Sequence, residues 1–242
     1  PEYIIFLYSL FIVFFFPLRK FFNKNIVNFD IKLTFLLINI LFPTFLLFIF
    51  DVRVYDGLRL FLYILPYFLT IPGIIFYYLI VKANNFYYKL LLSVSVILSF
   101  YYLINFFLIT PYHYTYLNFF AGKFSDAHEK FENDYWGISL KELSKKISND
   151  ERLISKKFIK FSVCGVSKKM TKYNLNKHAP KINYKIVRNE ENPDYVILTN
   201  RLTKISDNQE NKYSTCFNYH KGDNILQVER KNLALSVLKK HK

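Results

Sequence analysis

The stretch Phe-Glu-Asn-Asp-Tyr-Trp-Gly-Ile-Ser, residues 131–139, lies where a membrane-like composition gives way to a soluble one. Glu132 and Asp134 stand beside the only tryptophan of the chain, Trp136, and the glycine that follows permits a tight turn. Two interpretations remain open at this point. Either the indole is buried and anchors the turn, with Asp134 as a local cap, or the carboxylates and the ring contact a ligand near a membrane surface.

A helix is predicted to begin directly after this turn. Ser139 and Glu142, three residues apart, have the spacing of a capping box at a helix N-terminus. Leu140, Leu143 and Ile147 then fall on one face of a helix over residues 139–148.

The composition differs on the two sides of the turn. Of the 242 residues, 52% are hydrophobic; residues 1–110 carry 8 Lys and Arg against 4 Asp and Glu, and residues 111–242 carry 25 against 14. The lysines are dispersed, and the richness in Phe, Tyr, Ile, Asn and Lys is typical of an AT-rich genome. A basic domain beside anionic lipid headgroups explains the charge, so nucleic acid is not an expected partner.

The first part of the chain predicts a membrane-embedded all-α bundle of about four helices. Its apolar segments are residues 3–18, 33–50, 60–81 and 90–110, and each of the last three is long enough to cross a bilayer. The first segment follows neither a methionine nor a basic region and precedes no small-residue cleavage site, so it is not a signal peptide. We expect it to be the end of a span that begins upstream, which makes this chain the C-terminal part of a longer membrane protein.

The orientation is predicted from the basic residues that flank the short loops. They are Arg19, Lys20, Lys24 and Lys32 around the first loop, and Lys82 and Lys89 around the third. The positive-inside rule places these two loops in the cytoplasm. Residues 51–59 and everything after residue 110 then lie on the outer face of the inner (plasma) membrane.

The outer loop over residues 51–59 holds a second group of candidate site residues. Tyr55, Asp56, Gly57 and Arg59 lie just before a predicted span, and the guanidinium of Arg59 has the geometry to bind a phosphate or carboxylate at headgroup depth. The alternative is an arginine that extends to the interface and pairs locally with Asp56.

The rest of the chain predicts a small extracytoplasmic α/β domain. Residues 111–150 form an interfacial aromatic segment and a connecting helix, and residues 151–242 form the domain itself. Strands are predicted over residues 158–164, 184–187, 195–199, 213–219 and 225–229, with a hairpin turn at 221–224, and helices over 126–131, 166–177 and 233–238.

Few residues of this domain have a pattern typical of a cofactor site. His128 and Glu132 are four residues apart but have no further ligands at a diagnostic spacing, which favours a solvated helix face over a metal site. No cofactor is predicted, although a divalent metal remains open. Cys164 and Cys216 can pair in an oxidising compartment, but two separate buried thiols are the favoured interpretation.

Three patches together resemble a known family. They are Tyr55, Asp56, Gly57 and Arg59; then Pro111, Tyr112, Tyr114, Tyr116 and Asn118; then Phe131, Glu132, Asp134, Tyr135, Trp136, Gly137 and Ser139. In order and spacing they resemble the C-terminal part of bacterial polytopic glycosyltransferases of the GT-C type, related to protein mannosyltransferase family 39. The chain departs from the family where it has Leu60 after the arginine and Thr110 before the proline, since members have histidine at the first position and His-Pro at the second.

The resemblance implies an enzyme that moves a sugar from a polyprenyl-phosphate donor to an acceptor on the extracytoplasmic face. It implies that Tyr55, Asp56, Arg59, Glu132, Asp134 and Trp136 contact substrate, while the catalytic carboxylate lies in a loop upstream of Pro1. Membrane lipid and the polyprenyl-phosphate sugar are then the expected partners, and the acceptor is undefined. The alternative is a non-catalytic, membrane-anchored extracytoplasmic interaction domain.

Overall fold

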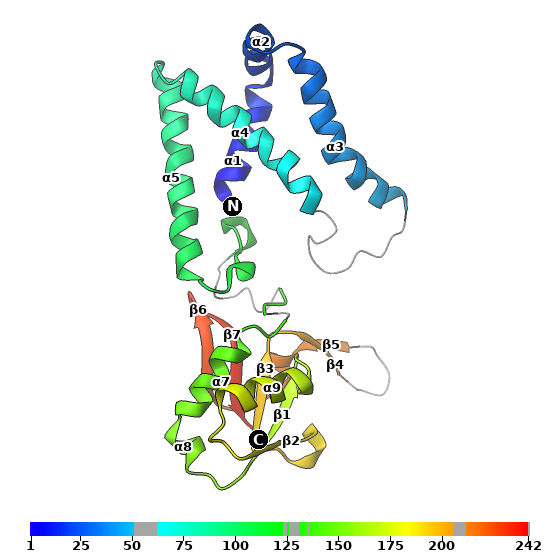
Figure 1. Cartoon of the computed structure of the whole chain (residues 1–242), viewed down its shortest axis with the longest axis vertical. Coiled ribbons are helices and arrows are strands. Elements are labelled where there is room, and N and C mark those ends of the chain that lie inside the picture. The colour runs from blue at the N-terminus through cyan, green and yellow to red at the C-terminus, as the bar shows by residue number, and fades with distance from the viewer. Residues whose placement is uncertain (51–61, 123–124, 126–130, 135, 206–211, 242) are drawn as a thin grey trace. The chain divides into compact units, whose positions relative to one another are not determined.

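The computed structural model describes residues 1–50, 62–122, 125, 131–134, 136–205 and 212–241. The chain divides into two compact units, Pro1–Leu103 and Ile104–Lys242. The described part of the first unit is helical, and the second contains a mixed sheet with helices packed on it (Figure 1). The expected combination of a helical region and a small α/β domain is therefore observed.

The first unit is built from helices that share one apolar core. They are α1 (Glu2–Val13), α2 (Phe15–Asn25), α3 (Phe29–Ile49), α4 (Leu65–Val81) and α5 (Phe86–Leu108), the last of which continues into the second unit. Helix α4 packs against both α1 and α3, and α2 packs against α3. Leu18, Ile75 and Leu79 are completely buried at these contacts.

Three of these helices are long and apolar enough to cross a membrane. They cover Phe29–Leu47, Leu62–Val81 and Phe86–Leu108. Most of their side chains are not covered by the rest of the chain, so their apolar surfaces need lipid or other helices around them. These helices match the second, third and fourth apolar segments of the sequence and support membrane association.

The first apolar segment differs from the expected straight span. Helices α1 and α2 meet at an angle of 82° around Phe14 and pass as a span only if the bent pair is counted as one. Pro17 explains the break, because its nitrogen cannot donate a hydrogen bond to the carbonyl of Val13 and continue α1. Consequently Arg19 and Lys20 lie within α2, and Lys24 is in its last turn, next to the connection to α3. The Arg19 guanidinium binds the Asp30 carboxylate through Nε (2.7 Å) and Nη2 (2.8 Å), which ties α2 to α3.

The second unit is organised around a five-stranded sheet in the order β2-β1-β3-β7-β6 (Figure 1). Its strands are β1 (Ile159–Cys164), β2 (Tyr184–Ile186), β3 (Tyr195–Thr199), β6 (Asn224–Arg230) and β7 (Leu233–Lys240). Strands β2, β1 and β3 are parallel, whereas β7 is antiparallel to both β3 and β6. Strands β4 (Leu202–Ile205) and β5 (Lys212–Thr215) form a separate antiparallel pair.

Helices cover both faces of the central strand β3. Tyr195 and Ile197 belong to the core under α7 (Leu140–Asn149) and α9 (Lys168–His178), whereas Val196 and Leu198 face Cys216 of α10 (Cys216–Tyr219). Every residue of β3 is buried, as expected for a strand inside an α/β sheet. The short helix α8 (Glu151–Ile154) and the 3-10 turns η2 (His113–Thr115), η3 (Phe119–Ala121) and η5 (Asn189–Glu191) complete the described elements.

The two cysteines are paired, so the expectation of separate thiols is wrong. Cys164 ends β1 and Cys216 begins α10, and their Cα atoms are 5.7 Å apart in the disulfide. The sequence predicts that both cysteines lie in strands, but it does not predict that the chain between them brings the two residues together.

The C-terminal hairpin also corrects the sequence prediction. Residues 233–240 form strand β7 and not a helix, and β6 pairs with β7 and not with residues 213–219, which divide between β5 and α10. Lys231 and Asn232 both have positive φ, 49° and 64°, which gives the two-residue turn with the twist that hairpins favour. Leu233, Leu235 and Leu238 belong to the core of the second unit.

Candidate functional site

Asp134 is the centre of a buried hydrogen-bonded turn. Its carboxylate accepts hydrogen bonds from the Tyr114 hydroxyl (2.5 Å), the Ile138 amide (2.7 Å), the Ser139 amide (3.1 Å) and the Ser139 hydroxyl. Its side chain is completely buried, and its backbone has a positive φ of 43°, which Asp tolerates better than most residues. Burial raises the pKa of this carboxyl group, while the four hydrogen bonds oppose that shift.

These contacts replace the capping box that the sequence predicts. The Ser139 hydroxyl donates to Asp134 and accepts no amide hydrogen of α7, and Ser139 itself has helical backbone angles. Instead, the Asp134 carboxylate accepts two amides just before α7, where the helix dipole favours a negative charge. The interpretation of Asp134 as a local cap is therefore the one that agrees with its contacts.

Glu142 is engaged in a second polar cluster. It accepts hydrogen bonds from Arg230 Nη2 (2.7 Å), Arg230 Nη1 (3.3 Å) and the Tyr112 hydroxyl (2.8 Å). Arg230 also donates from Nε to the Thr110 carbonyl (3.0 Å), and its guanidinium carbon lies 5.0 Å from the centroid of the Tyr112 ring. Burial raises the pKa of Glu142, but the hydrogen bonds from Arg230 and Tyr112 outweigh burial and leave it below the usual value.

The two clusters are adjacent, because the Tyr112 and Tyr114 rings meet edge to face at 6.3 Å. Tyr114 belongs to the second patch of the sequence resemblance, and Asp134 and Ser139 belong to the third. The structure therefore brings residues of these two patches into direct contact. Chemically, the acceptor sites of Asp134 are occupied by donors, so the arrangement favours positioning of the turn over proton transfer by this carboxylate.

Trp136 does not anchor the turn as a buried residue, so that interpretation is wrong. Its side chain is 52% exposed. It lines a pocket of about 530 Å³ together with Gly165, Val166, Ser167, Lys169, Met170, Tyr173 and Arg201. Glu132 is also exposed.

The pocket lies at the carboxyl ends of strands β1 and β3. Gly165 follows β1 with a φ of 80°, and a Cβ atom there would come within 2.6 Å of the carbonyl oxygen of Thr199, the last residue of β3. Glycine is therefore required where the two strand ends approach each other. Ser167 caps α9 by accepting the Met170 amide at 3.2 Å, and Arg201 follows β3 by two residues.

Other predicted site residues cannot be placed in this way. Tyr55, Asp56, Gly57 and Arg59 lie outside the described residues, as do His128 and most of the predicted helix over 126–131. The substrate-binding role assigned to Tyr55, Asp56, Arg59, Glu132, Asp134 and Trp136 stays a prediction. Within the described ranges, no three His, Cys, Asp or Glu side chains come together as potential metal ligands.

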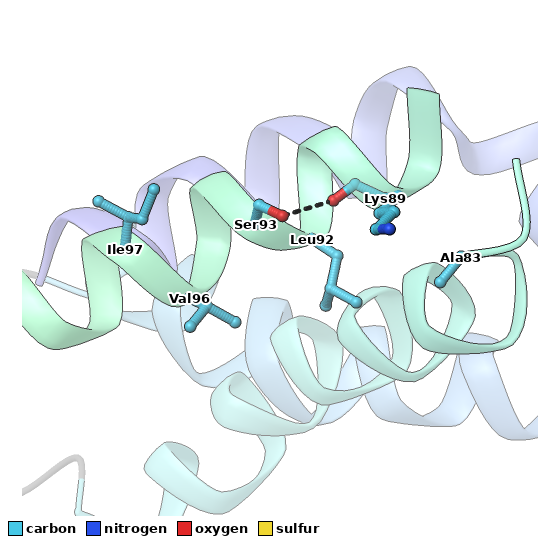
Figure 2. A pocket seen from close by; sticks show the side chains of 6 residues that line it. All are labelled: Ala83, Lys89, Leu92, Ser93, Val96 and Ile97. Atoms are coloured by element: carbon cyan, nitrogen blue, oxygen red, sulfur yellow. Dashed lines mark hydrogen bonds between the residues drawn. The ribbon is translucent and has the colours of Figure 1, made fainter. Parts of the chain in front are cut away.

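A hollow in the first unit is a weaker candidate (Figure 2). It measures about 460 Å³ and is lined by Ala83, Lys89, Leu92, Ser93, Val96 and Ile97. The Ser93 hydroxyl donates to the Lys89 carbonyl at 2.9 Å, one helical turn earlier, as the dashed line in Figure 2 shows. Apart from Ala83, its lining belongs to α5, a helix long and apolar enough to cross a membrane, so lipid can fill this space.

Sequence reasoning missed two arginines that the structure places at these sites. Arg230 precedes the unrecognised β6–β7 turn, and Arg201 follows β3 without any motif around it. For Arg201 the only available signal was its position, since polar side chains at the carboxyl ends of parallel strands gather at one edge of a sheet. Comparisons with protein-family models, with curated proteins and with solved structures found no match for this chain.

Proposed function

We propose that this chain is the C-terminal portion of an integral-membrane glycosyltransferase. It would take part in moving a sugar from a polyprenyl-phosphate donor to an acceptor on the extracytoplasmic face. The observation that carries the proposal is the hydrogen bond between Tyr114 and Asp134. Two sequence patches that resemble the GT-C glycosyltransferases, and that are separated along the chain, form one connected polar structure.

Two further observations support a membrane location for the chain and an extracytoplasmic location for its second unit. Three helices are long and apolar enough to cross a bilayer, which suits an enzyme whose donor is held in lipid. The Cys164–Cys216 disulfide fits an oxidising compartment, which for the second unit agrees with the outer location predicted from the basic loops.

Different parts of the enzyme would have different roles. Asp134 and Glu142 position the turn and α7, because donors already occupy their oxygens. Arg59, with Tyr55 and Asp56 beside it in sequence, would meet the donor phosphate and stabilise the charge that develops as the sugar departs. The catalytic base would come from a carboxylate upstream of Pro1.

The experiment compares two arginines of the same loop in the full-length enzyme. Membranes that contain wild-type enzyme, Arg59→Lys or Arg53→Lys are assayed for transfer of labelled sugar from a polyprenyl-phosphate donor. Arg59→Lys keeps the charge and loses the bidentate geometry, so we expect its rate to fall about 10²–10³-fold at normal protein level. Arg53→Lys should stay near the wild-type rate. Equal rates for wild type, Arg59→Lys and Arg59→Ala would show that Arg59 is only an interfacial anchor.

One observation favours the alternative of a non-catalytic interaction domain. The carboxylates of both Asp134 and Glu142 are held by hydrogen bonds, so neither has the open geometry of a general base. The upstream sequence separates the two functions, because the enzyme needs a carboxylate pair in its first outer loop. A full-length protein without that pair and without measurable sugar transfer would be a membrane-anchored binding protein.

A further inference from the structure

The pocket beside Trp136 occupies the position where open α/β sheets bind ligands. Strand β1 leads through α9 to β2 on one side, while β3 lies on the other side of β1. The order of the strands therefore reverses between β1 and β3, and the carboxyl ends of both parallel strands open at the same edge. A crevice at such a reversal is the usual ligand site of this architecture.

The charges of the pocket favour an anion. Arg201 and Lys169 line it, and none of its described lining residues is acidic. The first turn of α9 also faces this edge, where helix geometry leaves the amides of Lys168 and Lys169 without intrahelical acceptors. A guanidinium and a helix N-terminus together match the oxygens of a phosphate group.

A buried polar side chain lies directly behind Gly165, which is part of the pocket wall. Thr199 is completely buried, and its hydroxyl has no hydrogen-bond partner among the described residues. This hydroxyl lies directly against Gly165, where a Cβ atom would be only 2.6 Å away. Buried hydroxyls are normally paired, so this unpaired one leaves hydrogen-bonding capacity unfilled at the end of β3, next to the pocket.

The other wall of the pocket favours a ligand that also has a ring. The indole of Trp136 and the side chains of Met170 and Tyr173 present large exposed surfaces to solvent. Tyr173 is additionally contacted by Lys177, whose ammonium lies 3.1 Å from the phenol oxygen and adds positive charge on the same helix. An exposed indole beside cationic groups suits a small molecule with one flat, weakly polar face and one anionic end.

We propose that this pocket binds a phosphorylated sugar. Its phosphate would lie at Arg201, Lys169 and the first turn of α9, and its ring would lie against Trp136. The volume of about 530 Å³ falls within the range of small-molecule sites, about 300–1,000 Å³. The binding of a sugar phosphate can be measured without any sugar transfer. A failure to bind would therefore leave the proposed transferase activity untouched, and the reverse also holds.

The test uses Trp136 as its own reporter, because it is the only tryptophan of the chain. The purified chain in detergent micelles is titrated with glucose 1-phosphate, with inorganic phosphate and with glucose, followed by intrinsic fluorescence and in parallel by calorimetry. We expect saturable binding of the sugar phosphate, and at least about tenfold weaker binding of phosphate or glucose alone, since each lacks one half of the contacts. A further titration with nanodiscs that contain polyprenyl phosphate separates a lipid source of the phosphate from a soluble one.

Variants that each remove one positive charge, inside or outside the pocket, decide whether the pocket is where the sugar phosphate binds. Arg201→Gln and Lys169→Gln should each weaken binding about tenfold or more, whereas Lys172→Gln, on the same helix but outside the pocket lining, should bind like wild type. Arg201→Lys retains the charge and should fall between wild type and Arg201→Gln. Circular dichroism verifies that each variant is folded. Absence of heat and fluorescence change with all probes, or unchanged affinity in Arg201→Gln, would overturn the proposal.

Discussion

Removal of the Cys164–Cys216 disulfide is expected to destabilise the second unit by about 4 kcal/mol. The two cysteines are 52 residues apart in sequence, so the covalent bond closes a long loop in the unfolded chain. The chain-entropy relation for such a loop gives a lost entropy of about 14 cal/mol/K, which corresponds to about 4 kcal/mol at 25 °C. The stabilisation acts by restricting the unfolded state and requires no change in the native contacts.

Thermal unfolding in detergent measures this effect, with the fluorescence of Trp136 as a reporter of the second unit. At about 2.1 cal/mol/K of unfolding entropy per residue, a loss of 4 kcal/mol corresponds to a Tm that is lower by about 10–15 °C. We expect this difference between the oxidised protein and the protein in a phosphine reductant. The double variant Cys164→Ala and Cys216→Ala should unfold near the reduced protein and should not respond to the reductant.

Two outcomes would contradict the expected stabilisation by the disulfide. If the oxidised and reduced proteins unfold within about 2 °C of each other, the loop argument fails. If the unreduced, denatured protein still titrates two free thiols, the pairing itself is wrong.

Two further outcomes follow from buried groups. Asp134→Ala leaves the Tyr114 hydroxyl and two amides without their buried acceptor, so we expect the free energy of unfolding by urea to fall by about 3–5 kcal/mol. Tyr114→Phe removes one donor and should lower it by about 1–3 kcal/mol. Equal stability of wild type and both variants would contradict this role of Asp134. Burial lowers the pKa of His220 from 6.5 to about 4. As the pH falls, the unfolded chain therefore binds a proton at a higher pH than the native chain does. The free energy of unfolding should fall by about 3 kcal/mol between pH 6.5 and pH 4. In His220→Gln this part of the pH profile should disappear; a profile identical to wild type would exclude His220 as its source.

Elements whose pattern is local are the ones that the sequence predicts well. The apolar runs of α3, α4 and α5 need only length and hydrophobicity to be recognised, and the prediction for α9 lies within two residues of its observed bounds. The predicted and observed bounds of strand β3 are the same, because a short continuous apolar run after a Pro-Asp turn is typical of a buried strand.

The errors came from positions where distant residues decide the structure. Ser139 and Glu142 have the spacing of a capping box, but Glu142 binds Arg230, which is 88 residues away in sequence. The Ser139 hydroxyl donates to Asp134, which is five residues away, so that contact is local. The Lys231–Asn232 turn contains no glycine, so the hairpin that it closes was missed and β7 was assigned to a helix. The pocket was missed because its walls come from the turn at Trp136 and from the ends of β1 and β3.

The position of β7 in the sheet determines what a mutation in the C-terminal hairpin would do to the second unit. Strand β7 follows β6 in sequence but lies between β6 and β3, so it covers the long edge of a strand that is apolar on both faces. A proline or a charge that displaces β7 would turn β3 into an open edge with unpaired amides and carbonyls. Such an edge is a template for pairing with other chains. Lesions in the hairpin are therefore expected to appear as self-association of the second unit.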